Sequence, residues 1–149
     1  MYRFQLHTLA ARGKRPAAAA IFFLLLASAA QAAEYKVIAN PSVKSDSISA
    51  SDIKSVFLED TDSLDGSHVV PVLEKDGPVN DAFVKQCLGK TASTLTAYYR
   101  SLVFTGKASM PKILATDAEV VAYVAKTKGA VAYVSASAST AGVKTLELK

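Results

Sequence analysis

Apolar residues recur along this chain with two different periods, and their alternation predicts a layered α/β domain. Short runs of mainly apolar residues, typical of strands, occur at 35–39, 69–73, 130–134 and 143–148. The run at 69–73 is continuous, which suits a strand covered on both faces. Between these runs, apolar residues three and four positions apart predict four helices. The sequence therefore predicts an α/β fold with a mixed sheet flanked by helices.

Capping residues and glycines place the helix boundaries. Gly89 is expected to end the second helix, and the third carries its apolar residues at Leu95, Tyr98, Tyr99, Leu102 and Val103. Residues 59–67 are expected to be rich in turns, and 104–112 to form a loop. The residues expected to begin the helices are Ser49 with Asp52, Pro78, Thr91 or Ser93, and Thr116 with Glu119.

Residues 1–32 have the features of a signal peptide. Basic residues up to Arg15 precede an apolar run over 17–30, and Ala30-Gln31-Ala32 offers the small-x-small pattern that signal peptidase accepts. The run has about 14 residues, whereas a membrane-spanning helix needs roughly 20. We therefore expect cleavage, a periplasmic or secreted protein without a membrane span, and one domain over 33–149.

The basic character of the whole chain comes from this leader. The sequence has 17 Lys and Arg against 13 Asp and Glu. Four of the basic residues precede position 33 and all the acids follow it, so the remaining domain is formally neutral. Its charge gives no reason to expect nucleic acid or an anionic membrane as a partner.

Few side chains after the leader suggest catalysis or metal binding. Cys87 is the only cysteine and shares an apolar helical face with Phe83, where a buried thiol is the ordinary role and a reactive one the alternative. His68 is the only histidine after the leader, so a histidine metal site or a Ser-His triad lacks partners. The acidic stretch at 59–66 has Leu64 where a calcium loop needs a ligand. We expect no catalytic residues, no metal, no cofactor and no enzyme.

Two features around the predicted loop at 104–112 stay open. Arg100, Lys107 and Lys112 suit either a solvated loop or contact with an acidic partner or an anion. At least one of Tyr98 and Tyr99 is expected in the core, and the other could be a surface aromatic at an interface.

Several motifs of the chain resemble, in order and spacing, the second lobe of phosphate-type periplasmic substrate-binding proteins of phosphate ABC transporters. The resemblance covers nearly the whole domain and implies one lobe of a type 2 periplasmic-binding-protein-like fold. The matching motifs are Asn40-Pro41, Ser49 through Phe57-Leu58, Asp65-Gly66 before Val69-Val70-Pro71-Val72, Phe83 through Leu88-Gly89, Phe104-Thr105-Gly106-Lys107 with Pro111, and Val124 through Gly129-Ala130-Val131-Ala132-Tyr133.

The phosphate site that the resemblance implies is altered here. In phosphate binders of the family, an Arg, two further residues and then Gly-Ser-Gly-Thr hold the anion at a helix N-terminus. Aligned on Asp76-Gly77, this chain has Glu74 in place of the Arg, and Pro78 offers no amide hydrogen. These changes argue against phosphate binding in the family's manner.

What remains of that site forms the candidate ligand-binding set, which consists of Lys75, Gly77, Val79 and Asn80. The backbone amides of Val79 and Asn80 and the Asn80 side chain could still donate, and Lys75 could supply a cation to a small anion.

Two hypotheses of function follow. The first is an exported, non-enzymatic solute-binding-protein-like domain with the phosphate site largely lost. The alternative is an envelope protein–protein interaction module that retains the fold without a small ligand. The one-lobe architecture suggests completion by a homodimer or by an envelope protein partner, because a single lobe offers only half of a cleft.

Overall fold

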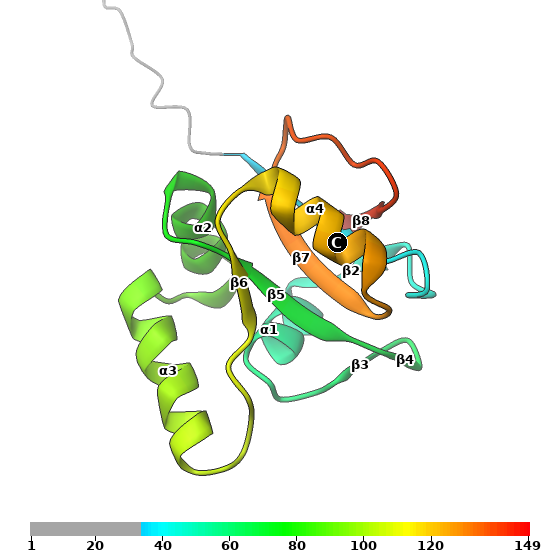
Figure 1. Cartoon of the computed structure of the whole chain (residues 1–149). Coiled ribbons are helices and arrows are strands. Elements are labelled where there is room, and N and C mark those ends of the chain that lie inside the picture. The colour runs from blue at the N-terminus through cyan, green and yellow to red at the C-terminus, as the bar shows by residue number, and fades with distance from the viewer. Residues whose placement is uncertain (1–33) are drawn as a thin grey trace, which may run out of the picture. The chain divides into compact units, whose positions relative to one another are not determined.

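A six-stranded mixed sheet organises the domain (Figure 1). The computed structural model describes residues 34–149, so the predicted signal peptide lies outside the described residues. The elements are β1 (Tyr35–Ala39), β2 (Ser47–Ile48), α1 (Ala50–Phe57), β3 (Ser63–Leu64), β4 (Ser67–His68), β5 (Val70–Glu74), α2 (Pro78–Phe83), the π-helix η1 (Val84–Leu88), α3 (Ala92–Phe104), β6 (Lys112–Leu114), α4 (Asp117–Lys126), β7 (Ala130–Ser135) and β8 (Lys144–Leu148).

The strands lie in the order β2-β8-β1-β7-β5-β6. β1 runs antiparallel to both β7 and β8, whereas β5 is parallel to β7 on one side and to β6 on the other. The mixed α/β class expected from the sequence is confirmed. One consequence matters for function: the three parallel strands β5, β6 and β7 end at the same edge of the sheet.

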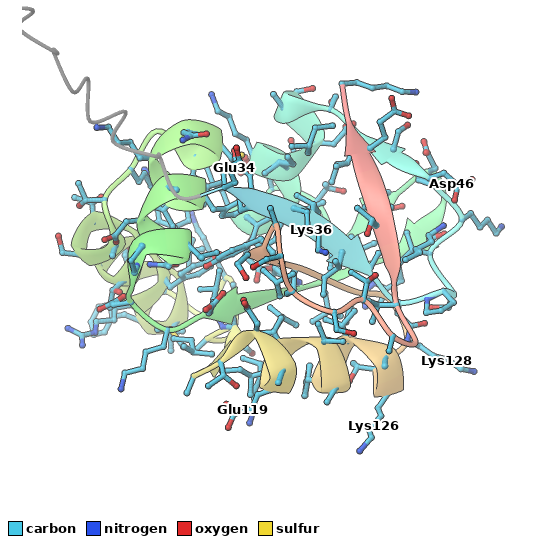
Figure 2. The ribbon with its side chains drawn as sticks, turned by 90° about the horizontal axis from the view of Figure 1, so that it is seen from above. Glu34, Lys36, Asp46, Glu119, Lys126 and Lys128 are labelled. Atoms are coloured by element: carbon cyan, nitrogen blue, oxygen red, sulfur yellow. The ribbon has the colours of Figure 1, made fainter. Side chains whose placement is uncertain are left out.

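Helices cover both faces of the sheet, as the apolar run of β5 predicts. Alternation along β7 sends Val131 and Tyr133 to the face under α1, α2, η1 and α3, and sends Ala132 and Val134 to the face under α4. Figure 2, viewed from above, shows α4 along one side of the sheet with Glu119 and Lys126 pointing away from it. The aromatic residues of the core gather on the first face, and small aliphatic residues fill the second.

The predicted helix starts are confirmed in most details. Ser49 and Asp52 form a reciprocal capping box at α1. Of the two candidates for α3, Thr91 is the cap, and it accepts from the backbone N–H of Thr94. Thr116 caps α4, but the carboxylate of Glu119 accepts from the Ala115 N–H rather than from the N–H of the cap, so the expected box is only half formed.

The chain crosses over closely where β4 meets the start of β7. Gly129 has φ of +76°, and a Cβ built there would lie 2.3 Å from the His68 carbonyl oxygen. Glycine is therefore required at this position by both conformation and space. Next to it, Asn40 is buried at the end of β1, and its amide donates to the carbonyls of Val124 and Ala125 at the end of α4.

Three details differ from the sequence-based predictions. β2, the β3–β4 hairpin and β6 were not predicted, because strands of two or three residues carry no period of their own and exist through pairing with neighbours. Residues 84–88 continue α2 as a π-helix, in which Cys87 is buried. Val103, expected on the apolar face of α3, is 46% exposed.

Candidate functional site

The candidate site lies where the parallel strands end. Glu74 closes β5, Leu114 closes β6 and Ser135 closes β7, while α2 and α4 begin beside them. In open α/β sheets, ligands bind outside the carboxyl ends of the strands, where helix N-termini present free amides. The topology therefore brings the predicted turn at 75–80 to the edge of the sheet at which binding is expected.

Of the four predicted site residues, Lys75 and Gly77 lie in the turn between β5 and α2, and Val79 and Asn80 lie in the first turn of α2. Gly77 is the N-cap residue of α2 and its carbonyl accepts from the Asp81 N–H at 2.9 Å. Lys75 is exposed and Val79 is half-buried. Asn80 is the one member that points into the protein, with 4% of its surface exposed. Whether any of these residues binds a ligand stays a prediction.

Asn80 is held by a hydrogen-bond chain that the sequence did not reveal. The backbone N–H of Glu74 donates to the Tyr133 hydroxyl at 3.2 Å, and this hydroxyl donates to the Asn80 Oδ1 at 2.5 Å. The ring of Tyr133 is fixed in turn by stacking on Phe83, with centroids 3.9 Å apart. This hydrogen-bond chain ends at the amide oxygen of Asn80, whereas the Nδ2 atom of Asn80 has no hydrogen-bond partner among the described residues.

Asn80 lines a cavity of about 160 Å³ between β5, β6, α2 and α3. The wall is mainly apolar, with Leu73, Leu95 and Ile113 contributing side chains on this side of the sheet. Thr96 adds a hydroxyl that donates to the Ala92 carbonyl at 3.0 Å and so keeps its lone pairs for another donor. Lys75 also lies on the wall of the cavity. The space is large enough for a few water molecules or one small solute.

The side chain of Glu74, which replaces the family's Arg in the alignment, points to the opposite face of the sheet. Strand alternation places its side chain on the same side as Val72, toward α4. Its Oε2 atom is buried and has no hydrogen-bond partner among the described residues. Burial, and then the charge of Asp117, raises the pKa of Glu74 to about 7. Asp117 itself accepts from the backbone N–H and the hydroxyl of Ser135.

Acidic groups outnumber basic ones at this edge. Asp76 lines the cavity, Glu74 and Asp117 lie at the same edge on the side of α4, and Lys75 and Lys36 supply the ammonium groups there. Carboxylates near helix N-termini stabilise the helices. They also oppose the approach of an anion, which is the reverse of what a phosphate site requires.

The remaining candidate residues fall outside this site. Cys87 is 8% exposed and lies 3.0 Å from the Tyr35 hydroxyl, so it is buried as expected. His68 is exposed beside Asp62, with their nearest side-chain atoms 3.5 Å apart. Within residues 34–149 no three His, Cys, Asp or Glu side chains are grouped so that they could hold a metal ion. The same residues contain no helix with the length and apolar character needed to cross a bilayer.

Sequence reasoning missed Tyr133, Thr96 and Asp117 as members of this edge. Tyr133 lies within a motif of the family resemblance, but only the fold shows that its hydroxyl reaches Asn80. Asp117 could be identified from the sequence only as a residue of a helix first turn. A family motif or a helix-start pattern does not show contacts such as that of Tyr133 with Asn80, which are 53 positions apart.

The fold matches solved phosphate-binding proteins. A phosphate ABC transporter substrate-binding protein from Clostridium perfringens, solved with bound phosphate, matches with a TM-score of 0.60 and 17% identity, covering 77% of this chain and 44% of that one. PstS from Borrelia burgdorferi matches with a TM-score of 0.59 and 10% identity, covering 78% and 47%. An ABC-type phosphate transport receptor from Vibrio cholerae matches with a TM-score of 0.51 and 10% identity, covering 77% and 46%.

These matches define the class of fold: the chain has a phosphate-binding-protein-like fold and spans less than half the length of the solved proteins that it matches. At this level of identity the likeness is one of fold alone. No family model and no curated protein matches the chain.

Proposed function

We propose that this protein is an exported, non-enzymatic solute-binding domain whose family-type phosphate site is largely lost. The fold that it shares with phosphate-binding proteins supports the general class. The non-enzymatic part of the proposal is supported by the matched proteins, which are substrate-binding and transport-receptor proteins.

The observation that carries the proposal is the free amide of Asn80. Among the described residues, only Glu74 Oε2 is fully buried without a hydrogen-bond partner, so the Nδ2 atom of Asn80 keeps some access to solvent. Water or a solute that enters the cavity can therefore accept from it. Here the oxygen of the same amide is fixed by Tyr133 and the side chain lines a cavity, so the donor is held ready for an acceptor.

The neighbouring charges favour an uncharged solute over phosphate. Glu74 and Pro78 replace an Arg and an amide donor of the family's site, and Asp76 adds a carboxylate at the turn. We infer that the occupant is a small molecule with a carbonyl oxygen to accept from Asn80 Nδ2 and an aliphatic part to lie against Leu73, Leu95 and Ile113. Lys75 lies on the wall of this cavity, and Gly77 and Val79 belong to the turn and helix start beside it.

Export belongs to the same proposal. The basic leader, the apolar run and the Ala30-Gln31-Ala32 sequence support cleavage after residue 32 and release into the periplasm or outside the cell. Sequencing the N-terminus of the protein recovered from the exported fraction tests this part. A mature chain beginning near Ala33 is expected, whereas an intact leader on cell-associated protein would contradict export.

The solute site is tested by NMR chemical-shift titration of residues 34–149, which contain the whole sheet and both hydrophobic clusters. Acetamide and isobutyramide are the probes. The amides of Thr96, Tyr99 and Ile113 are expected to shift in the wild type. Asn80→Asp keeps the oxygen that faces Tyr133 and replaces the free donor, so it should abolish these shifts.

Gln86→Glu is the matched control, because it makes the same kind of isosteric change on the exposed side of the adjoining helix. It should titrate like the wild type. Equal shifts in the Asn80→Asp variant, or shifts confined to residues away from the cavity, would contradict the proposed site.

A second candidate function is supported by an independent observation. A group of apolar side chains near the end of α3 is exposed, as expected for a protein–protein interaction module.

A further inference from the structure

The exposed apolar residues of this protein are concentrated in one place. Five large apolar side chains of the described residues are exposed, and four of them fall between positions 103 and 113. Phe104 is 93% exposed, and Val103, Met110 and Ile113 are each more than 40% exposed. Single exposed apolar residues are ordinary, but several of them on neighbouring elements mark a surface that another molecule covers. We call this group, with the strand and helix that carry it, the α3–β6 face.

The helix that carries this face is weakly held by its own domain. Only Leu95 and Tyr99 of the thirteen residues of α3 are buried. Arg100 is the one charged residue of the helix. A helix that is exposed over most of its surface normally carries many charged residues. Figure 1 shows α3 at the side of the sheet next to β6, which is the last strand of that sheet and has no strand on its outer side.

Charges of opposite sign border the α3–β6 face. Arg100 and Lys107 are exposed on the helix and on the turn that ends it, where the Lys107 N–H donates to the Leu102 carbonyl. On another side lies the acidic turn after α1, with Asp60 and Asp62, which is tied to α3 because the Tyr98 hydroxyl donates to the Leu58 carbonyl at 2.6 Å. A groove beside Met110 and Ile113 is lined by Glu59 and Asp62, and Lys112 also lies on its wall.

A surface with apolar residues and charges of both signs around them can be complementary to itself. In a twofold-symmetric dimer each residue contacts the symmetry-related set, so apolar meets apolar and the basic side of one copy meets the acidic side of the other. An anionic membrane would attract the basic side but would be repelled by the acidic one. The charge pattern therefore favours a second copy of this chain over a lipid surface.

We propose that the α3–β6 face binds a second copy of this chain in a twofold dimer, with Phe104 near its centre and with Arg100 and Lys107 of each copy facing Asp60 and Asp62 of the other. This inference goes beyond the proposed solute site and does not depend on it. The solute titration and the measurements below can therefore fail separately.

Sedimentation equilibrium of residues 34–149 tests the dimer. The wild type is expected to associate reversibly as its concentration rises. Phe104→Asp should weaken the association at least about tenfold, as expected for a residue at the centre of an interface. Leu148→Asp is the matched control, because Leu148 is the exposed apolar residue outside the face and should leave the association unchanged. A chain that remains monomeric at every concentration, or equal effects of the two substitutions, would overturn the proposal.

Charge reversal tests the twofold arrangement itself. A chain with Arg100→Glu and Lys107→Glu, and a second chain with Asp60→Lys and Asp62→Lys, should each associate more weakly than the wild type. Mixing the two should restore the association, because every acid–base contact re-forms in the mixed pair. Mixed chains that stay monomeric, or monomers that instead bind vesicles of anionic phospholipid, would overturn it.

Discussion

The helices α2 and α3 follow one another in the chain but are held in different ways. α2 and its continuation η1 bury five of eleven residues, namely Asn80, Phe83, Val84, Cys87 and Leu88. α3 buries two of thirteen. The first helix is therefore part of the scaffold that positions the candidate solute site. The second helix leaves most of its residues unburied and available to a partner. Binding of a solute and docking of a partner are assigned here to different parts of one small domain.

The largest expected difference between the two helices is in stability. Phe83 is fully buried between Phe57, Tyr35 and Tyr133, so Phe83→Ala should cost about 3–5 kcal/mol of unfolding free energy. Phe104 is 93% exposed, so Phe104→Ala should change that free energy by less than about 0.5 kcal/mol. Urea unfolding of dilute protein measures both. Similar losses for the two substitutions would show that α3 packs more tightly than described.

The attachment of α3 can be tested at two tyrosines. Tyr99 is buried and its hydroxyl donates to the Phe57 carbonyl, so Tyr99→Phe should cost about 1–3 kcal/mol by leaving that acceptor unsatisfied. The Tyr98 hydroxyl bonds the Leu58 carbonyl at a half-buried position, where water can replace it, so Tyr98→Phe should cost less. The same unfolding experiment compares them. A larger loss at Tyr98 would contradict the assignment of Tyr99 as the main anchor.

A smaller effect is expected from the carboxyl of Glu74, which depends on pH. Its folded-state pKa of about 7 lies above the ordinary value of 4.5, because burial and Asp117 disfavour the charged form. The folded protein therefore holds this proton more tightly than the unfolded chain. The resulting stability is fully present below pH 4.5 and is lost as the pH rises through about 7.

Glu74→Gln cannot ionise, so it should stabilise the fold relative to the wild type more at pH 8 than at pH 5. Denaturant midpoints at the two values measure the difference. Partial exposure of Glu74 makes the effect modest, because solvent screens the charge. Glu147→Gln, at an exposed position on β8, is the control and should change the two midpoints equally. An equal change for Glu74→Gln would contradict the shifted pKa.

Most of the fold could be predicted from the sequence because its main elements carry their own signals. The four longer strands, the capping residues Ser49 and Thr116, and the helix end at Gly89 were all indicated by local pattern. β6 could not be predicted, because its three residues form a strand only by pairing with β5. The exposure of Val103 could not be predicted either, since helical spacing alone does not tell which apolar residues find a partner.

The candidate site could be predicted only in part. The turn at 75–80 was identified from its alignment with a family motif. The features that give it chemical meaning depend on contacts across the sheet: Tyr133 fixes the oxygen of Asn80, and Glu74 turns toward Asp117 rather than toward the turn. These contacts join residues that are far apart in the chain, and no local pattern reports them.

The most direct test of the central claim, that this lobe keeps the fold of phosphate-binding proteins without their anion site, is calorimetric titration of the mature protein with phosphate and then sulfate. The protein should first be unfolded and refolded to remove any bound ligand. No binding heat is expected at millimolar anion. Micromolar phosphate binding, worth roughly −8 kcal/mol, would contradict it and would mean that the turn from Lys75 to Asn80 still holds the anion despite Glu74 and Pro78.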